Sequence, residues 1–169
     1  MKACANMKPI AILAACGLAL AAVPVLAQNA AQIDHARSGA NCPHCNLFQA
    51  DLSARELPGR NFAGARLRQA DFSASEMDHS NFAGGDLRDV NAYGGRFTGA
   101  VFSGANLTNA SFVGAYLEGA NFRGARLAGV NFSGAEMDRA RGLSRGQLMG
   151  ACGDEATRLP AGLHLRRCD

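Results

Sequence analysis

The stretch Ala-Asn-Leu-Thr-Asn-Ala-Ser-Phe-Val-Gly-Ala-Tyr-Leu-Glu-Gly-Ala-Asn-Phe-Arg-Gly (105–124) repeats one five-residue pattern four times. Each pentad has a small residue, a polar residue, a large apolar centre, a variable residue and often a glycine. This register continues without insertion or deletion from Cys45 to Arg139, giving 19 pentads, 18 of them with a large apolar centre. The sequence therefore predicts a core built from many small, similar steps.

A period of five residues excludes an α-helix. Five helical steps of about 100° would rotate each centre by roughly 140° from the last, so no apolar stripe would form. Glycine also lies two residues after the centre in 11 of 19 pentads, and each would cost a helix about 1 kcal/mol relative to alanine. Short extended segments that end in bends, with every centre pointing inward, fit the pattern instead.

The identity of the centres predicts four pentads in each coil. Centres 20 residues apart are identical in 8 of 15 comparisons, whereas centres 15 residues apart are identical in 3 of 16. One face should stack leucines and another phenylalanines, about 4.8 Å apart. These two core ladders are Leu47, Leu67, Leu87, Leu107 and Leu127, and Phe62, Phe82, Phe102 and Phe122.

Pentads such as Ala-Asp-Leu-Ser-Ala (50–54), Ala-Asn-Leu-Thr-Asn (105–109) and Ala-Asn-Phe-Arg-Gly (120–124) resemble the pentapeptide-repeat family. The resemblance implies an all-β solenoid, a right-handed quadrilateral β-helix of about 4.75 coils. Two departures from the pattern stand out. Arg55 and Arg60 replace small inward residues of the first coil, and Ala92 breaks the core, so we expect a thinner core there or an inward shift of Tyr93.

The first 27 residues are typical of a bacterial export signal. Lys2 and Lys8 precede an apolar stretch, and Val25-Leu26-Ala27 offers a cleavage site after Ala27. Met1 or Met7 could be the initiator, and the Leu-Ala-Ala-Cys stretch that ends at Cys16 leaves a lipoprotein as the alternative. We predict a periplasmic or secreted protein without a transmembrane segment in its mature form.

Removal of the signal leaves four cysteines, which allow three pairings in an oxidising compartment. Proximity favours Cys42 with Cys45 and Cys152 with Cys168. Residues 28–41 lack periodicity and indicate a flexible lead-in. The repeat should occupy residues 42–141, and residues 142–169 should form a cap.

A helix signal begins the predicted cap. Ser144 is a candidate N-cap and Gln147 completes a capping box, so we predict a short helix from Arg145 to Ala151. An irregular apolar lid should follow it. Covered ends would protect the unpaired strand edges of the solenoid.

The motif Cys42-Pro-His-Cys45 is the sharpest chemical signal, because it resembles the dithiol of periplasmic thiol oxidases. That chemistry needs a helix N-terminus to lower the thiol pKa, and here a β-coil is expected to follow. Zinc ligation by Cys42, Cys45 and His44 or His35 lacks a second pair of ligands at zinc spacing. We expect no catalytic, cofactor or metal site.

The outward charges are unequal on opposite faces. The face with the leucine ladder carries Arg66, Arg68, Arg88 and Arg126 against Asp86 and Asp89. The opposite face, here called the acidic face, carries Glu56, Glu76, Asp78, Glu118, Glu136 and Asp138 against Arg96 and Arg139. Mixed charge can simply keep a shaft soluble, and a stripe of one sign can also dock a partner.

The sequence favours a non-catalytic, exported module that acts as a rigid structural or protein-binding rod, with an unidentified protein partner. The resemblance adds one alternative, a mimic of DNA that protects DNA gyrase. The export signal and a nearly balanced charge, 15 Arg against 14 acids after the signal, argue against it, because a DNA mimic needs strong negative charge. The second alternative is a thiol-disulfide oxidoreductase that uses Cys42 and Cys45. We expect no nucleic-acid partner.

Overall fold

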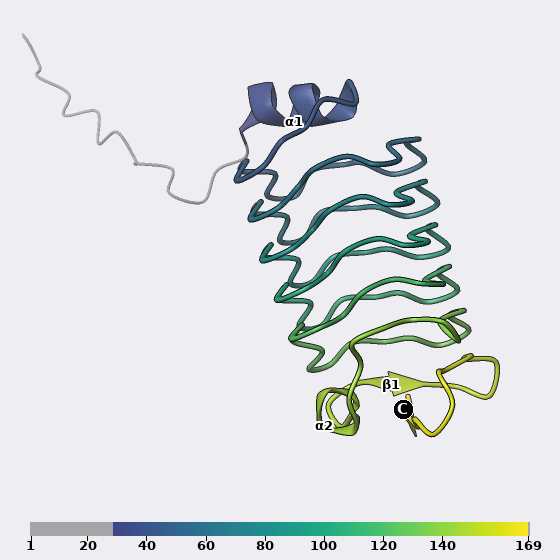
Figure 1. Cartoon of the computed structure of the whole chain (residues 1–169). Helices are drawn as coiled ribbons and strands as arrows, with labels where there is room; N and C mark the ends of the chain where they lie inside the picture. The colour runs from purple at the N-terminus through teal and green to yellow at the C-terminus, as the bar shows by residue number, and fades with distance from the viewer. Residues whose placement is uncertain (1–28, 169) are drawn as a thin grey trace, which may run out of the picture.

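The computed structural model describes residues 29–168 as a four-sided shaft of stacked coils with a helix at each end (Figure 1). Helix α1 spans Ala30–Arg37 and helix α2 spans Arg145–Leu148. Strand β1, Cys152–Gly153, pairs in parallel with strand β2, Arg166–Arg167. The proposed signal peptide, its cleavage site and Cys16 lie outside the described residues.

Parallel backbone bridges join residues 20 apart along the whole shaft, as the comparison of pentad centres predicted. Asn46 pairs with Arg66, which pairs with Asp86 in the next coil. The N–H of Leu47 donates to the carbonyl of Arg66 at 2.8 Å, and the N–H of Arg66 donates to the carbonyl of Cys45 at 2.8 Å. Each coil therefore uses its neighbours to satisfy its backbone, since buried N–H and C=O groups need partners.

The pentad centres fill the tube, and the two predicted core ladders are buried, each residue at most 2% exposed. Phe62, Phe82, Phe102 and Phe122 stack with ring centroids 5.2–5.4 Å apart. Offset stacks at this spacing add to the energy gained by burying the rings.

The core around Ala92 is filled from the adjacent face. Ala92 is 1% exposed, but Tyr93 is 61% exposed, so the expected inward shift of Tyr93 is wrong. The ring of Phe97 instead lies 6.2 Å from that of Phe72 and 5.6 Å from that of Phe112. A large centre next to a small one keeps the total side-chain volume of that coil, which is what close packing requires.

The polar residue before each centre has a local backbone role. Asn61 accepts a hydrogen bond from the N–H of Ala63 at 3.0 Å, and Asp71 accepts one from the N–H of Ser73 at 2.8 Å. An Asn or Asp side chain thus holds the bend two residues later. This explains the preference for Asn and Asp at that position.

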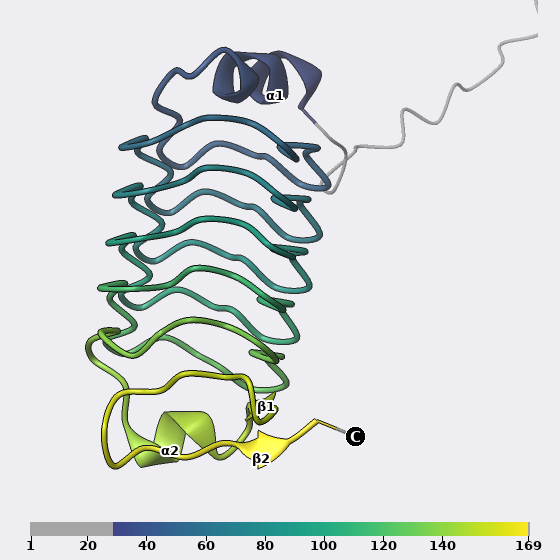
Figure 2. The same ribbon diagram turned by 90° about the vertical axis from the view of Figure 1, so that its right-hand side faces the viewer.

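The predicted flexible lead-in is wrong, because residues 30–37 form helix α1 over the first coil (Figures 1 and 2). Asn29 caps it by accepting from the N–H of Gln32 at 3.1 Å. Ile33 and Ala36, three residues apart, are 5% and 0% exposed against the core. Two apolar positions in one short helix give too weak a pattern to predict it without the surface that it covers.

The first coil also begins earlier than predicted. Residues 41–45 form an additional pentad with Cys42, 1% exposed, as its centre. The N–H groups of Cys42 and His44 donate to the carbonyls of Asn61 and Ala63, both at 2.8 Å. The register therefore extends one pentad before the nineteen seen in the sequence.

The first coil accepts its two arginines near its open end. Arg55 is exposed, and Arg60 is partly buried with its Nε atom lacking a hydrogen-bond partner. One coil further on, small serines occupy the equivalent inward positions, and Ser80 accepts from the N–H of Arg60 at 3.0 Å. The long side chains thus lie where no preceding coil competes for space.

Helix α2 ends three residues before the predicted Ala151, and the coil then resumes. Ser144 accepts from the N–H of Gln147 at 3.3 Å and donates to its side-chain oxygen at 2.9 Å. Cys152 bridges to Asn131 and Arg158 bridges to Glu136. The repeat ladder therefore continues past the predicted boundary at residue 141, interrupted only by α2.

A further layer completes the C-terminal cap. Strand β2 pairs with β1, and Cys152 is joined to Cys168, with their Cα atoms 4.9 Å apart. Leu159, Leu163 and Leu165 pack partly buried against the core. Among residues 29–168, no helix is long and apolar enough to cross a bilayer.

Candidate functional site

The acidic face is interrupted by arginines that pair with its carboxylates. Arg96 donates through Nε to Asp78 at 2.7 Å and through Nη2 to Glu76 at 3.0 Å. Asp78 also accepts from the N–H of Thr98 at 3.0 Å. Arg96 therefore neutralises two of the six acids that we expected to form a continuous stripe.

Two further arginines neutralise the C-terminal part of the acidic face. Arg139 pairs with Glu118 at 3.0 Å, and Arg158 pairs with Glu136 at 3.8 Å. Arg158 belongs to this face only because the coil resumes after α2, which the sequence pattern did not reveal. Glu56 and Asp138 are the two members of the predicted face for which the described residues provide no ion pair.

A groove with aromatic and charged walls lies in the middle of the shaft. We call it the central groove, and it is lined by Ala74, Ser75, Glu76, Gly94, Arg96 and Tyr116. Tyr116 is 48% exposed, and Tyr93, next to the groove residue Gly94, is 61% exposed. The only two tyrosines of the chain thus lie at one corner of the shaft.

The repeat explains why a groove forms here. Ala74 and Gly94 occupy the same bend in successive coils, both with positive φ, and their small size leaves the bend shallow. Glu76, Arg96 and Tyr116 occupy equivalent outward positions in three successive coils, joined by bridges. They form a wall beside the bend. The outward position of Tyr116 was visible in the sequence, but Tyr93 was expected in the core.

The leucine face balances its charges within itself. Arg88 donates two hydrogen bonds to Asp86, both at 2.7 Å, and Arg68 pairs with Asp89 at 3.3 Å. The hydrogen bonds from Arg88 hold the pKa of the Asp86 carboxyl below its ordinary value. The guanidinium of Arg66 lies 5.5 Å from the ring centroid of Phe48. This face therefore offers less uncompensated charge than its composition indicates.

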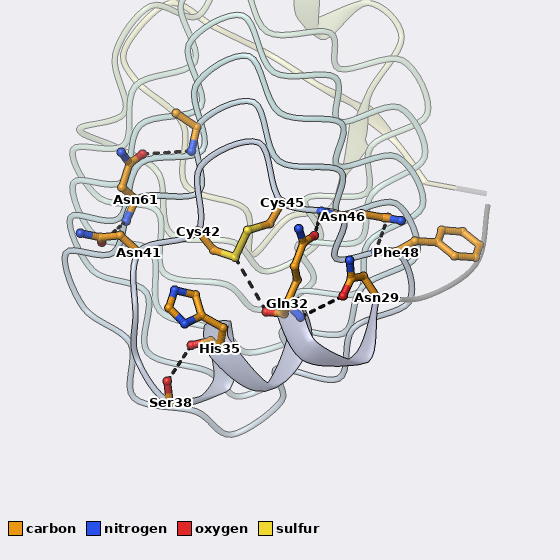
Figure 3. Close-up of a disulfide and its surroundings, with 11 residues drawn as sticks. Asn29, Gln32, His35, Ser38, Asn41, Cys42, Cys45, Asn46, Phe48 and Asn61 are labelled. Atoms are coloured by element: carbon orange, nitrogen blue, oxygen red, sulfur yellow. Dashed lines mark hydrogen bonds between the residues drawn. A yellow bond between two sulfur atoms is a disulfide. The ribbon is translucent and has the colours of Figure 1, made fainter. Parts of the chain in front are cut away.

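The Cys42-Pro-His-Cys45 segment lies in a β-coil beneath α1 (Figure 3). Cys42 and Cys45 are joined as a disulfide with their Cα atoms 5.4 Å apart. The next helix among the described residues is α2, a hundred residues further on. No helix N-terminus follows the motif, which is the feature that thiol oxidases use to lower the pKa of the attacking thiol.

The histidines do not assemble into a site. His35 lies on α1, His44 and His79 lie at bends on the shaft, and His164 lies in the cap. Within residues 29–168, no group of three or more His, Cys, Asp or Glu side chains is placed to hold a metal ion.

A model of pentapeptide repeats matches the chain in eight copies. The matched segments are residues 61–91, 86–124, 105–141 and 115–151, which together span residues 61–151, more than half of the 169 residues. None of the curated proteins matches the chain.

Solved structures of pentapeptide-repeat proteins are similar to the chain. HetL, involved in heterocyst differentiation regulation in the cyanobacterium Nostoc sp. strain PCC 7120, is 28% identical over 79% of this chain and 57% of its own, with a TM-score of 0.46. AT2G44920 from the Arabidopsis thaliana thylakoid lumen is 30% identical over 59% of this chain and 66% of its own, with a TM-score of 0.32.

A third structure, Rfr23 from the cyanobacterium Cyanothece 51142, is 20% identical over 76% of this chain and 97% of its own, with a TM-score of 0.33. The chain thus spans less than two thirds of the length of HetL and AT2G44920. From the extent of the repeat match, the chain belongs to the pentapeptide-repeat family.

Proposed function

We propose that the protein is a non-catalytic, exported interaction module that binds a protein partner at the central groove. The observation that carries the proposal is the pair of exposed tyrosines beside Arg96 on a shaft that is otherwise covered by small polar residues. Tyrosine and arginine are enriched among the residues that contribute most to protein interfaces.

Rigidity of the shaft supports this role. Tyr93 and Tyr116 lie on consecutive coils joined by backbone hydrogen bonds, such as that from the N–H of Phe97 to the carbonyl of Tyr116 at 2.8 Å. The coils that carry them pack around buried phenylalanine rings. A surface held in this way loses little conformational entropy on binding, which favours affinity.

The ion pairs of Arg96 favour a mixed polar and aromatic contact over imitation of nucleic acid. Paired carboxylates present less negative charge than a phosphate backbone, which carries one charge about every 1.7 Å along the duplex. Glu76 and Arg96 line the groove together, so a partner would meet both signs of charge there.

Site-specific crosslinking tests the groove. The photoreactive residue p-benzoylphenylalanine replaces Tyr93 in cells, and the matched control replaces Thr108 on the leucine face. A single adduct from position 93, absent from position 108 and lost when Tyr116→Ala is added, would support the proposal. Equal adducts from both positions, or an adduct indifferent to Tyr116→Ala, would contradict it.

Export is tested separately by fractionation and by sequencing the N-terminus of the product. We expect a periplasmic or extracellular protein that begins at Gln28. A cytosolic product that retains Lys2 and Lys8 would contradict export, and it would leave the test of the groove unaffected.

A further inference from the structure

The C-terminal end of the shaft is its basic end. Residues 120–168 contain eight arginines and four acids, a net charge of 8 − 4 = +4, whereas residues 29–119 contain seven arginines and nine acids, a net charge of 7 − 9 = −2. Charge is thus separated along the axis of the shaft as well as between its faces. An anionic partner would be drawn to the C-terminal end.

A groove with an apolar floor opens at that end, between α2 and β2. We call it the end groove, and it is lined by Arg145, Leu148, Met149, His164, Leu165 and Arg166. Leu148 is buried and Leu165 is half-buried, while Met149 is 80% exposed. An apolar side chain as exposed as Met149 remains in contact with water unless a partner covers it.

The charged residues of the end groove are all basic. Arg145, Arg166 and His164 lie around the apolar floor, and no carboxylate lines it. Arg145 is exposed and makes no ion pair with any residue from 29 to 168. An occupant therefore needs both an apolar group for the floor and negative charge for the rim.

A second groove adjoins the first and shares His164 and Leu165 with it. Its other lining residues include Leu159, Pro160 and Leu163, which extend the apolar floor along the loop of the cap. Asp154 at its far side is engaged by the N–H of Gly134 at 2.8 Å and the hydroxyl of Thr157 at 3.0 Å. The two grooves together form a track long enough for several residues of an extended chain.

We propose that the end groove docks an acidic segment of a protein partner, with one apolar side chain on Leu148 and Leu165 and flanking carboxylates on Arg145 and Arg166. A nucleic acid would match the basic rim but would place a charged backbone over the apolar floor. A membrane would match both features, but among the described residues of this end only Met149 is a strongly exposed large apolar side chain, which is too little for stable insertion. This site is separate from the central groove and does not depend on it.

Binding of designed peptides tests the proposal. Fluorescently labelled Glu-Glu-Leu-Glu-Glu is titrated into the purified protein, and Gln-Gln-Leu-Gln-Gln and Lys-Lys-Leu-Lys-Lys serve as controls of charge. We expect the acidic peptide to bind at least tenfold more tightly than the glutamine peptide, and the lysine peptide to bind most weakly. Equal binding of the three peptides would overturn the proposal.

Two variants with the same charge change locate the site. Arg145→Glu should weaken the acidic peptide at least tenfold, and α2 should persist because an acid in the first turn of a helix is favourable. Arg123→Glu, an exposed residue of the last regular coil outside both grooves, should change affinity less than twofold. Equal losses in the two variants would mean unspecific attraction and would overturn the proposal.

Methionine methyl NMR gives a readout that charge alone would not move. Met77 and Met137 are buried at 0% exposure, whereas Met149 is exposed. The acidic peptide should shift the Met149 methyl signal and leave those of Met77 and Met137 in place. Binding without a Met149 shift would place the peptide elsewhere and overturn the proposal.

Competition separates the other classes of partner. Vesicles of anionic phospholipid, or a DNA duplex, that bind more tightly than the peptide and displace it would overturn the proposal in favour of a membrane or a nucleic acid. The Tyr93→Ala, Tyr116→Ala variant should bind the peptide normally. Loss of binding in that variant would show that the two grooves are one site, contrary to the proposal.

Discussion

The two ends of the shaft close the same kind of open coil with different means. At the N-terminal end, the side-chain oxygen of Gln32 accepts from the backbone N–H of Asn46 at 2.6 Å (Figure 3). At the C-terminal end, the side-chain nitrogen of Gln147 donates to the carbonyls of Phe122 and Ala125 at 2.9 and 3.0 Å. The amide of glutamine carries both a donor and an acceptor, so one residue type completes either backbone edge.

The ends differ in what they leave exposed. Helix α1 is a compact cover that buries Ile33 and Ala36 and leaves a polar outer surface, whereas the C-terminal cap continues the ladder and leaves Met149 and two grooves open. We infer that the N-terminal cap serves mainly to close the solenoid. The C-terminal cap combines closure with a surface that can bind.

The largest effects should follow from removing the apolar anchors of the two caps. Ile33→Ala and Leu148→Ala should each lower the free energy of unfolding by about 2–4 kcal/mol, because each deletes a buried branched side chain and leaves a cavity. Hydrogen exchange should rise in the coil next to the altered end first, since coils contact only their neighbours. A uniform rise along the shaft would show that the ends do not open independently.

The two disulfides should rank by the length of chain that they close. Replacement of Cys152 and Cys168 by serine, with a sequence separation of 16 residues, should cost about 3 kcal/mol by chain entropy. Replacement of Cys42 and Cys45, separated by 3 residues, should cost about 2 kcal/mol on the same scale. Chemical denaturation of the two double variants measures both values, and the reverse order would mean that the N-terminal clip does more than shorten a loop.

A change from glutamine to glutamate should separate the two caps. Gln32→Glu keeps an oxygen for the N–H of Asn46, so we expect a loss below about 0.5 kcal/mol. Gln147→Glu keeps the capping box with Ser144 but removes the donor to two carbonyls, so we expect a loss of about 1–2 kcal/mol. Gln32→Ala and Gln147→Ala are the controls, because both remove the hydrogen bonds and should behave alike.

Acid should weaken both ends through one carboxylate each, with the smallest effects. The N–H of Gly134, then Thr157 and Ala156, hold the pKa of Asp154 below its ordinary value, and the hydroxyl and N–H of Ser53 do the same for Asp51. A lowered pKa in the folded state gives a stabilisation that is present above about pH 4 and is lost as pH falls through the folded pKa.

Thermal unfolding between pH 5 and pH 2 measures this loss for each end. Asp154→Asn should flatten the part of the pH dependence that arises at the C-terminal cap, and Asp51→Asn the part that arises in the first coil. Both carboxylates are exposed, so the steeper acid effects of the whole protein should remain. A pH profile unchanged by both variants would contradict a role for these hydrogen bonds.

The shaft was predictable because its signal is repeated in every pentad. The spacing of Leu47, Leu67 and Leu87 alone indicated the number of pentads in a coil, and Ser144 with Gln147 indicated where α2 begins. Helix α1 was missed because its evidence is a single N-cap and two apolar residues. The central groove was missed in part because Ala92 was expected to draw Tyr93 inward, whereas the space is filled by Phe97 from the next face.

The amino-acid sequence by itself determined the period, the four-sided coil and the burial of the leucine and phenylalanine ladders, since these depend on contacts that recur every 20 residues. Only the tertiary structure decided which charges meet, how the ends are closed and where the grooves open. Arg158 reaches Glu136, and Leu148 lies near Leu165, through segments that interrupt the repeat. Such contacts occur once, so no periodic signal announces them, and they form only after the coils have placed distant segments side by side.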